Sequence, residues 1–186
     1  MNATTATVAA CLRNPKQVAT VIPSSGRLTH CISQRSCISR ARSVIELGAG
    51  VGNTTTALLQ AMPTSSKLLA IEMTDDFMPA LEAIEDQRLR VEHGDALSLR
   101  DIAEKYHLNK ADAIVSGIPF STIPQSQCLE LMQTISEMLT PCGKFIAYQF
   151  SKSIKNYASQ FLKPINEHRV WWNFPPLVVY EFGRKG

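Results

Sequence analysis

Glycines and acids are spaced along the first half of the chain in a way that suits the binding of a small polar ligand. The segment Gly48-Ala49-Gly50-Val51-Gly52 follows an apolar run that ends near Glu46. Glycines at alternate positions let the backbone turn without a Cβ in the way and let a ligand approach the main chain closely. Glu72 and Asp95 each come at the end of a later apolar run. Parallel strands end at one edge of a sheet, where ligands bind in this kind of fold, so we expect the three acids to line that edge.

The positions of the glycines separate two kinds of cofactor loop. A dinucleotide-binding turn has the spacing G-x-G-x-x-G, whereas here position 53 is Asn and the third glycine, Gly52, comes one residue early. This spacing resembles the class I S-adenosylmethionine-dependent methyltransferases, as do Glu46 before the loop and Gly94-Asp95-Ala96 after the third apolar run. The resemblance implies a methyltransferase that uses S-adenosyl-L-methionine as its cofactor.

The same resemblance implies a role for each part of the cofactor site. The glycine loop would pass under the methionine part of the cofactor, and Glu46 would help to orient its amino acid group. Glu72 would accept hydrogen bonds from both ribose hydroxyls, which a carboxylate can do in a bidentate fashion, and Asp95 would accept one from the adenine amino group. The alternative is that Glu72 and Asp95 are solvated strand ends. The cofactor residues that we expect are Glu46, Gly48, Ala49, Gly50, Gly52, Glu72, Met73, Gly94, Asp95 and Ala96.

Alternating strand and helix patterns predict an α/β fold around these residues. Strands are expected near 43–47, 67–72, 88–93, 111–115 and 143–150, and helices near 53–62, 75–86, 98–107, 125–139 and 152–162. Thr74 and Ser98 suit N-caps, the latter with Asp101 three residues on. Two late apolar runs, 168–173 and 177–183, suit an antiparallel hairpin. We therefore predict the three-layer, Rossmann-like class I methyltransferase fold, with a seven-stranded, mostly parallel sheet and an antiparallel edge hairpin.

The acceptor side of the site is expected in Ser116-Gly117-Ile118-Pro119-Phe120, directly after the fourth predicted strand. A proline-containing turn exposes carbonyls that can accept N–H bonds from an amine and aim its lone pair, and the Ser116 hydroxyl can help to orient that amine. Phe120 offers a ring face to a cationic, methylated nitrogen, unless it is simply a buried side chain in a turn. Tyr148, at the end of the fifth predicted strand, is a candidate polar neighbour. We identify no general base. The catalytic residues that we expect are Ser116, Gly117, Ile118, Pro119 and Tyr148.

Two families share this kind of acceptor loop. Adenine N-methyltransferases, including the ribosomal RNA adenine dimethylases, have Asn or Asp where this chain has Ser116, and they carry an extra helical RNA-binding domain that we do not expect here. The chain more closely resembles the bacterial phospholipid N-methyltransferases of the short, soluble, rhizobial type. The shared segments are Asn14-Pro15-Lys16-Gln17-Val18, Ile22-Pro23-Ser24-Ser25, Ile45-Glu46-Leu47-Gly48-Ala49-Gly50, Ser116-Gly117-Ile118-Pro119 and Arg169-Val170-Trp171-Trp172-Asn173-Phe174-Pro175-Pro176. The resemblance implies that Pro23, Ser24 and Ser25 lie on the substrate side. The chain departs from the family at Ser151-Lys152, where Thr-Tyr is usual, which leaves the head group and the number of methyl groups open.

Charge is distributed unevenly along the 186 residues, although the net charge is only +3. Residues 1–43 carry +6 with no acid, residues 44–143 carry −8 and residues 144–186 carry +5. Basic ends indicate a polyanionic partner, either nucleic acid or an anionic membrane surface. No apolar run approaches the roughly 20 residues that cross a bilayer, and we expect no secretory signal. The five cysteines form no C-x-x-C pair, which favours reduced thiols in the cytoplasm and no metal site.

The acid-free start of the chain, 1–42, is expected to form a basic helical segment that lies on a membrane and caps the substrate, ahead of a methyltransferase domain over 43–186. Arg13, Lys16 and Arg27 would face anionic lipid. Its apolar positions are Val8, Leu12, Val18, Ile22, Leu28 and Ile32. The same composition also suits a transit peptide.

The expected function is methylation of a phospholipid amine, favouring phosphatidylethanolamine and extending to phosphatidylcholine, by a peripheral enzyme of the inner membrane surface. The alternatives are an amine methyltransferase that acts on ribosomal RNA or on a small molecule, and a cofactor-binding protein without turnover. Oligomeric state is not predicted.

Overall fold

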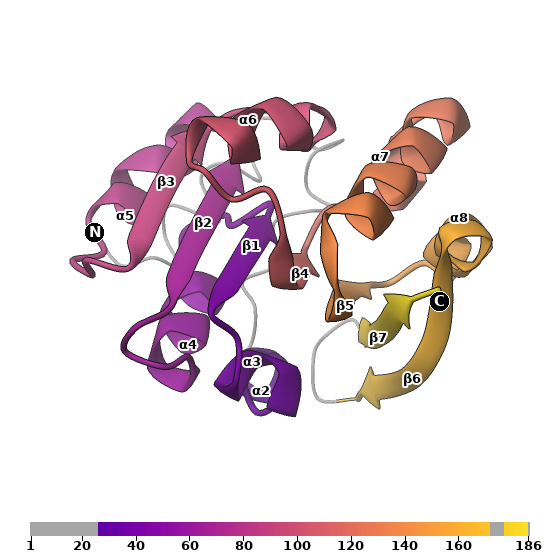
Figure 1. Cartoon of the computed structure of the whole chain (residues 1–186), viewed down its shortest axis with the longest axis horizontal. Helices are drawn as coiled ribbons and strands as arrows, with labels where there is room; N and C mark the ends of the chain where they lie inside the picture. Colours follow the sequence, from indigo (N-terminus) through magenta and orange to yellow (C-terminus); the bar gives the residue numbers. More distant parts are fainter. Residues whose placement is uncertain (1–25, 172–176, 186) are drawn as a thin grey trace.

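The computed structural model describes residues 26–171 and 177–185 (Figure 1). The expected substrate-side residues Pro23, Ser24 and Ser25, together with Arg13 and Lys16, lie outside the described residues.

Within this part of the chain, seven strands form one sheet in the order β3-β2-β1-β4-β5-β7-β6. The strands are β1 (Ser43–Leu47), β2 (Lys67–Glu72), β3 (Leu89–His93), β4 (Ala111–Ser116), β5 (Leu139–Gln149), β6 (Leu162–Val170) and β7 (Leu177–Arg184). The first five pair in parallel, whereas β7 runs antiparallel to both β5 and β6. The predicted α/β fold, with its mostly parallel sheet and antiparallel edge hairpin, is confirmed.

Helices cover both faces of the sheet because its central strands are apolar on both sides. One core contains side chains from α2 (Gly26–Ser33), α3 (Ser36–Ser39), α4 (Asn53–Ala61) and α5 (Met78–Glu82). The other contains side chains from α6 (Leu99–Lys105), α7 (Gln125–Met138) and α8 (Ser153–Phe161). Three single 3-10 turns, η2 (Asp75–Phe77), η3 (Ala96–Ser98) and η4 (Phe120–Thr122), follow β2, β3 and β4.

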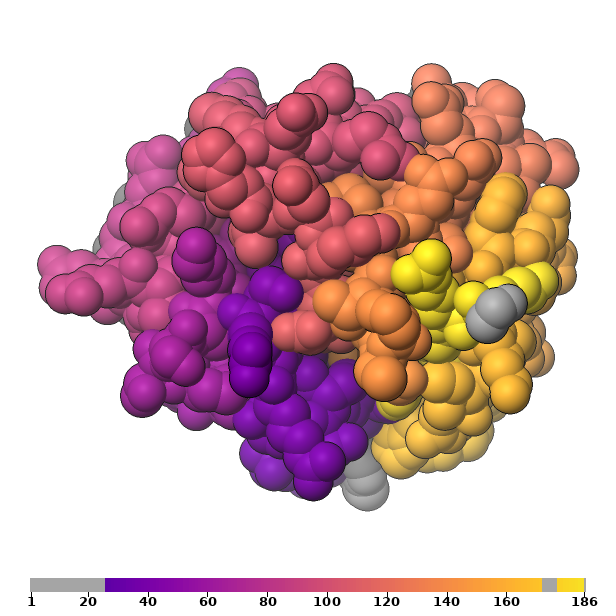
Figure 2. All heavy atoms as spheres, in the orientation of Figure 1, coloured from indigo at the N-terminus to yellow at the C-terminus, as the bar shows by residue number. Residues whose placement is uncertain are grey.

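The described part of the basic N-terminal region packs against the rest of the protein. Leu28 and Ile32, one helical turn apart in α2, are fully buried in the core that α2 shares with α4. The expectation that these two side chains face a membrane is therefore wrong, because the sheet already covers them. Arg27 is exposed on the same helix. Figures 1 and 2 show that α2 and α3 lie beside β6.

The start of β6 and the starts of two helices differ from prediction, whereas β7 lies where a strand was expected over 177–183. β6 begins at Leu162 instead of near 168, because it is an edge strand with both faces exposed and so carries no alternating pattern. Its Pro164 is acceptable there, since an edge strand need not donate from every N–H. The helix expected over 75–86 is a 3-10 turn followed by the short α5. Ser98 precedes α6, but its side chain makes no capping hydrogen bond. The side chain of Asp95 instead caps the preceding turn, η3.

Candidate functional site

The loops that carry the expected residues leave one edge of the sheet. Each loop begins with a glycine whose N–H donates to the neighbouring strand: Gly48 to Ile71 O, Gly94 to Glu72 O and Gly117 to Leu47 O, all at 2.9 Å. The pairing of Leu47 with both Ile71 and Ser116 places the cofactor loop between the other two loops. The loops after β1, β3 and β4 therefore lie at one edge of the sheet, as the sequence predicts.

The glycine loop after β1 has a backbone that only glycine adopts easily. Gly48, Gly50 and Gly52 have φ angles of +74°, +59° and +88°. Gly52 is also the N-cap of α4. A Cβ on Gly50 would meet no heavy atom of the described residues within 4 Å, so among them this part of the loop is open. A ligand can therefore lie directly on the main chain at Gly50.

The Glu72 carboxylate ties the end of β2 to this loop. Its Oε2 accepts the Gly50 N–H at 2.8 Å, and its Oε1 accepts those of Met73 and Thr74 at 3.0 and 2.8 Å. A carboxylate has about four acceptor positions. Three are therefore engaged in shaping the loop, which leaves one for a ligand hydroxyl, whereas the resemblance implied hydrogen bonds from both ribose hydroxyls.

Glu46 is a fully buried acid beneath the loop. The Thr55 hydroxyl donates to its Oε2 at 2.6 Å, and its Oε1 is buried without a hydrogen-bond partner. Burial raises the pKa of Glu46 to about 8, with the nearby Glu72 charge adding to the rise. A buried acceptor without a donor is costly, and the ammonium end of an amino acid would supply that donor. This arrangement fits S-adenosylmethionine. Thr55, the first-turn residue of α4 that holds Glu46, was not predicted, although a Thr three residues after the glycine loop was a visible signal.

The far end of the cofactor edge is apolar and exposed. Met73 and Leu97 follow β2 and β3, which pair in parallel, and both side chains are exposed. Asp95 is exposed between them in sequence, and its Oδ1 accepts the Leu97 N–H at 2.9 Å. Asp95 thus caps η3 and keeps its other oxygen for a ligand. The sequence did not indicate Leu97, because the exposure of its side chain depends on how η3 folds. His93 contacts Met73 O at 3.1 Å and Asp75 at 3.3 Å.

The acceptor loop after β4 differs from expectation at Ser116. Its side chain is fully buried and its Oγ accepts the Ile118 N–H at 3.3 Å, so it shapes the turn instead of facing an amine. Pro119 O accepts both the N–H and the hydroxyl of Thr122 at 2.9 Å, and closes η4. Gly117 and Ile118 are partly exposed, as is Pro119, so this part of the loop can still contact an acceptor.

Tyr148 lies directly on the acceptor loop. A Cβ on Gly117 would stand 2.5 Å from the Tyr148 hydroxyl oxygen and 2.8 Å from its ring carbon Cζ. The same hydroxyl lies 3.4 Å from the Thr54 hydroxyl in α4. Tyr148 therefore lies beside both the loop after β4 and the first turn of α4. This is where a polar neighbour of the acceptor is expected.

Phe120 does not offer a ring face to a substrate. Its side chain is fully buried in the core beneath η4, and its ring packs edge-on against Phe145 at a centroid distance of 6.5 Å. The expectation of a cation–π contact is wrong, because the 3-10 turn directs the ring inward.

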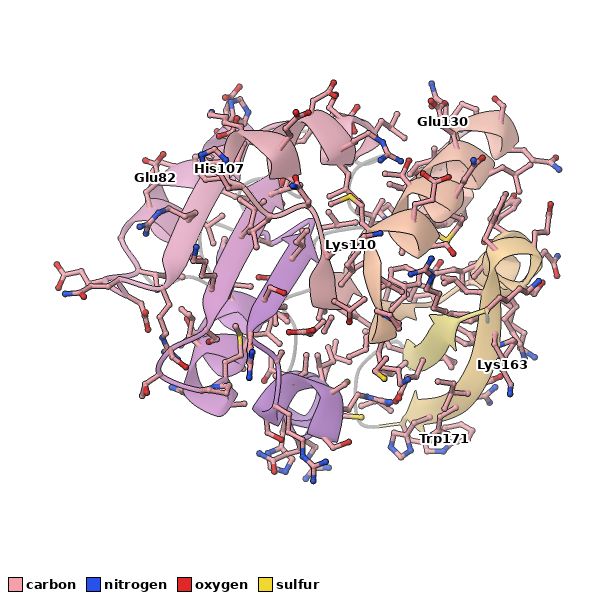
Figure 3. All side chains as sticks on the ribbon, in the orientation of Figure 1. Glu82, His107, Lys110, Glu130, Lys163 and Trp171 are labelled. Carbon is pink, nitrogen blue, oxygen red and sulfur yellow. The ribbon has the colours of Figure 1, made fainter. Side chains whose placement is uncertain are left out.

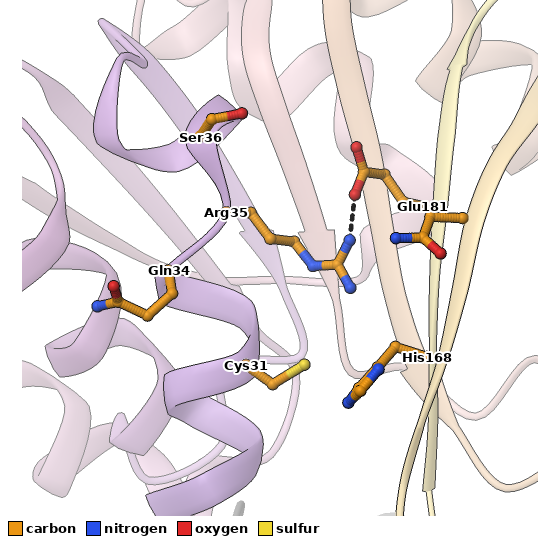
Figure 4. Close-up of a pocket in the computed structure, with 7 residues that line it drawn as sticks. Cys31, Gln34, Arg35, Ser36, His168 and Glu181 are labelled. Atoms are coloured by element: carbon orange, nitrogen blue, oxygen red, sulfur yellow. Dashed lines mark hydrogen bonds and ion pairs between the residues drawn. The ribbon is translucent and has the colours of Figure 1, made fainter.

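A separate polar pocket of about 310 Å³ lies between the N-terminal helices and the edge strands (Figure 4). An ion pair of Arg35 with Glu181 crosses it, and Cys31, Gln34, Ser36 and His168 line it. Glu181 pairs with Ile146, part-way along β5 and before the acceptor edge. Burial, with a smaller contribution from the Glu181 charge, raises the pKa of Cys37 to about 11. The ion pair connects α3 to the edge hairpin, and no sequence pattern indicated it because its residues are 146 positions apart.

Comparison with known proteins agrees with this geometry. The family described as Ribosomal RNA adenine dimethylase matches residues 24–153. An ornithine lipid N-methyltransferase of Singulisphaera acidiphila is 28% identical over 130 residues, 69% of this chain and 68% of that protein. A ribosomal RNA small subunit methyltransferase A of Erythrobacter litoralis is 29% identical over 157 residues, 74% of this chain and 54% of that protein. The chain thus spans about half the length of the latter.

Solved structures share the fold at low sequence identity. The 1,6-didemethyltoxoflavin-N1-methyltransferase of Burkholderia thailandensis, solved with S-adenosylhomocysteine, superposes with a TM-score of 0.69 at 13% identity over 99% of this chain and 88% of that one. Together with the glycine loop and the unpartnered oxygen of Glu46, these matches make S-adenosylmethionine the cofactor. The chain belongs to the ribosomal RNA adenine dimethylase family and is a class I S-adenosylmethionine-dependent methyltransferase.

Proposed function

We propose that this enzyme methylates the amine head group of a membrane lipid. The observation that carries the proposal is the match to an ornithine lipid N-methyltransferase, which extends over two thirds of both proteins. Phosphatidylethanolamine is the expected acceptor from the sequence resemblance, and ornithine lipid is the acceptor that the relative's name suggests. Both are primary amines on a lipid.

The acceptor loop favours a flexible amine over a nucleobase. Where the adenine enzymes have an Asn or Asp side chain, this chain has Ser116, which is buried and accepts the Ile118 N–H. Recognition of an adenine amino group needs an acceptor that reaches it, and the Ser116 hydroxyl is occupied in the turn. The carbonyls of Gly117 and Ile118 can instead accept N–H bonds from an amine.

Catalysis by these residues consists mainly of positioning. When bound, S-adenosylmethionine supplies a methyl group on a sulfonium, which the amine nitrogen takes by in-line displacement. A primary amine with a pKa near 10.4 is mostly protonated at neutral pH, so the loop must select its neutral form and direct the lone pair. Alignment of this kind supplies much of the acceleration of a displacement reaction. Tyr148, held over Gly117, would fix the position of the loop and of the amine together.

The membrane partner is part of the proposal. The chain carries +6 over residues 1–43 and +5 over residues 144–186, and such ends bind anionic surfaces. In the described residues, no helix has the length and apolar character needed to cross a bilayer. The enzyme would then work from the cytoplasmic side, on the surface of the inner membrane, with Arg13, Lys16 and Arg27 among its lipid contacts.

Methyl transfer to defined acceptors tests the proposal. The purified chain receives labelled S-adenosylmethionine with vesicles of phosphatidylethanolamine, ornithine lipid or phosphatidylglycerol, or with small-subunit ribosomal RNA. Label should enter the amine lipids and not phosphatidylglycerol, and mass spectrometry of the product counts the methyl groups. Label in RNA adenines with none in either amine lipid would overturn the proposal and establish the activity of the second relative.

A further inference from the structure

Exposed apolar side chains gather at the edge of the sheet that carries the site. Among the described residues, the large exposed hydrophobics are Met73 (60%), Leu97 (38%), Phe150 (39%), Ile165 (49%) and Trp171 (67%). Four of these five directly follow or lie just beyond the C-terminal ends of β2, β3, β5 and β6. Ile165 alone lies within a strand. Met73 and Leu97 belong to the cofactor end, which leaves Phe150 and Trp171 without an assigned partner.

Strand pairing places these two rings within one residue of the same level. Val178 of β7 pairs with Gln149 of β5 on one side and with Arg169 of β6 on the other. Because β7 is antiparallel to both neighbours, β5 and β6 run in the same direction and end together. Phe150 and Trp171 therefore leave the sheet two strand spacings apart, about 10 Å. Ser116 pairs with Ala147, so the acceptor loop leaves the same edge next to Phe150.

The charged residues nearest to the two rings in sequence are positive. The Arg169 guanidinium lies 4.9 Å from the centre of the Trp171 ring, and Lys152 is exposed two residues after Phe150. The only acids in residues 144–186 are Glu167 and Glu181. Glu167 pairs with Lys155, and Glu181 pairs with Arg35. In Figure 3, Trp171 projects outward beyond the end of β6.

We propose that Phe150 and Trp171, flanked by Lys152 and Arg169, insert into the head-group region of an anionic bilayer and hold the acceptor edge of the sheet against it. Aromatic rings beside Lys and Arg are the composition that binds a membrane interface. The inference rests on the proposed lipid substrate, and it adds a second contact surface that is distinct from the N-terminal segment. A lipid amine lying in the head-group region would then be level with Gly117 without leaving the bilayer.

The observations favour a bilayer over RNA as the occupant of this edge. Non-specific binding of single-stranded nucleic acid uses a continuous basic groove that follows the phosphates, with aromatic rings stacked along it. Here two cations border two rings at the rim, and Phe150 has no polar atom to contact a base or sugar. This pattern matches a planar interface with apolar interior and anionic surface.

Binding to vesicles tests the surface independently of turnover. The full chain is sedimented with vesicles of phosphatidylglycerol and phosphatidylcholine, and with phosphatidylcholine alone. The double variant F150S/W171S should bind anionic vesicles at least about tenfold more weakly, whereas I165S, which removes a comparable exposed side chain from the same edge strand, should bind like wild type. K152E/R169E should lose binding to anionic vesicles to a similar degree. Thermal unfolding checks that each variant is folded, which is expected because the replaced side chains are exposed.

Activity on two forms of substrate separates this inference from the proposed function. F150S/W171S should lose far more rate on amine lipid in vesicles than on the same head group in a dispersed short-chain lipid. If wild type methylates neither form, the proposed function fails, and the vesicle assay still reports on the surface. Wild-type binding and wild-type vesicle rates in F150S/W171S would overturn the inference, as would loss of vesicle binding equally in I165S. Displacement from vesicles by an RNA oligonucleotide that itself binds through Phe150 and Trp171 would assign the surface to RNA instead.

Discussion

The hydroxyl of Thr55 donates a 2.6 Å hydrogen bond to the buried carboxyl group of Glu46 and is its single partner within the described residues. This bond joins the end of β1 to the first turn of α4 beneath the glycine loop. It stabilises one oxygen of a fully buried acid and leaves the other oxygen without a donor among the described residues. The carboxyl group is therefore held ready for a cationic ligand group and is expensive to ionise without one.

The first prediction concerns stability and pH. Burial raises the pKa of Glu46 to about 8 in the folded chain, from 4.5. Between these values the unfolded chain has lost a proton that the folded chain keeps, so stability falls as pH rises from about 4.5 to about 8. The loss should be on the order of a few kcal/mol. Urea denaturation at pH 5 and pH 8 measures it, and E46Q, which cannot ionise, should show a smaller difference. An equal pH dependence in both proteins would place the titrating group elsewhere.

The second prediction concerns proton release on cofactor binding. An ammonium group beside Glu46 Oε1 favours the ionised carboxylate, so binding of S-adenosylhomocysteine at pH 7 should release up to about one proton from this group. Calorimetric titration in buffers of different ionisation enthalpy counts the protons. E46Q should bind more weakly and release fewer protons. Unchanged release in a folded E46Q would remove Glu46 from the binding site.

Glu46, Arg35 and β6 show which features can be predicted from the sequence and which cannot. Glycine spacing and apolar runs are local signals, and they placed the cofactor loop, the central strands and the acids at their ends. The burial of Ser116 and Phe120 depends on how η4 folds back on the sheet. The Arg35–Glu181 pair joins residues 146 positions apart, and β6 has both faces exposed, so its side chains follow no period. These features come from tertiary packing, which no short window of sequence contains.

The third prediction concerns Glu72. E72A removes the acceptor of three backbone N–H groups and of one expected ribose hydroxyl. Affinity for S-adenosylhomocysteine should fall by about 1.5–3 kcal/mol, and the free energy of unfolding should fall by about 1–3 kcal/mol, since the loop loses its tie to β2. Calorimetry and urea denaturation measure the two effects. E82A, at an exposed position on α5, is the matched control and should change neither. A folded E72A with wild-type affinity would contradict the role of Glu72 in the site.

The fourth prediction compares two glycines of the loop. Both G50A and G52A put a Cβ on a residue with positive φ, which costs about 1–2 kcal/mol. At Gly52 the new methyl group also meets the side chain of Ile84 at 2.5 Å, so G52A should be the less stable protein. At Gly50 the methyl group enters open space above the loop. G50A should therefore be more stable than G52A. For each kcal/mol of stability lost, however, G50A should lose more affinity for the cofactor than G52A does. Parallel losses of stability and affinity in the two variants would show that no ligand lies on Gly50.

The last prediction concerns the contact of Tyr148 with Gly117. Gly117 is not among the glycines with positive φ, so G117A adds little backbone strain. It acts mainly by displacing the Tyr148 side chain, whose hydroxyl oxygen would lie 2.5 Å from the new Cβ. If that ring positions the acceptor loop, turnover should fall by about tenfold or more, as small misplacements cost this much in displacement reactions. Affinity for S-adenosylhomocysteine should change little, because the cofactor loop is not touched.

A double-mutant cycle decides whether the two residues act as one unit. Y148F removes the nearest atom but leaves the ring carbon at 2.8 Å, so G117A/Y148F should recover only part of the activity, whereas G117A/Y148A relieves the clash completely. Contact residues give a coupling energy of about 0.5–3 kcal/mol in such a cycle. The cycle compares the turnover on lipid amine of wild type, G117A, Y148A and G117A/Y148A. Thermal unfolding checks that each protein is folded. Strictly additive effects would mean that Tyr148 does not position the loop, and that the acceptor amine is held by the carbonyls of Gly117 and Ile118 alone.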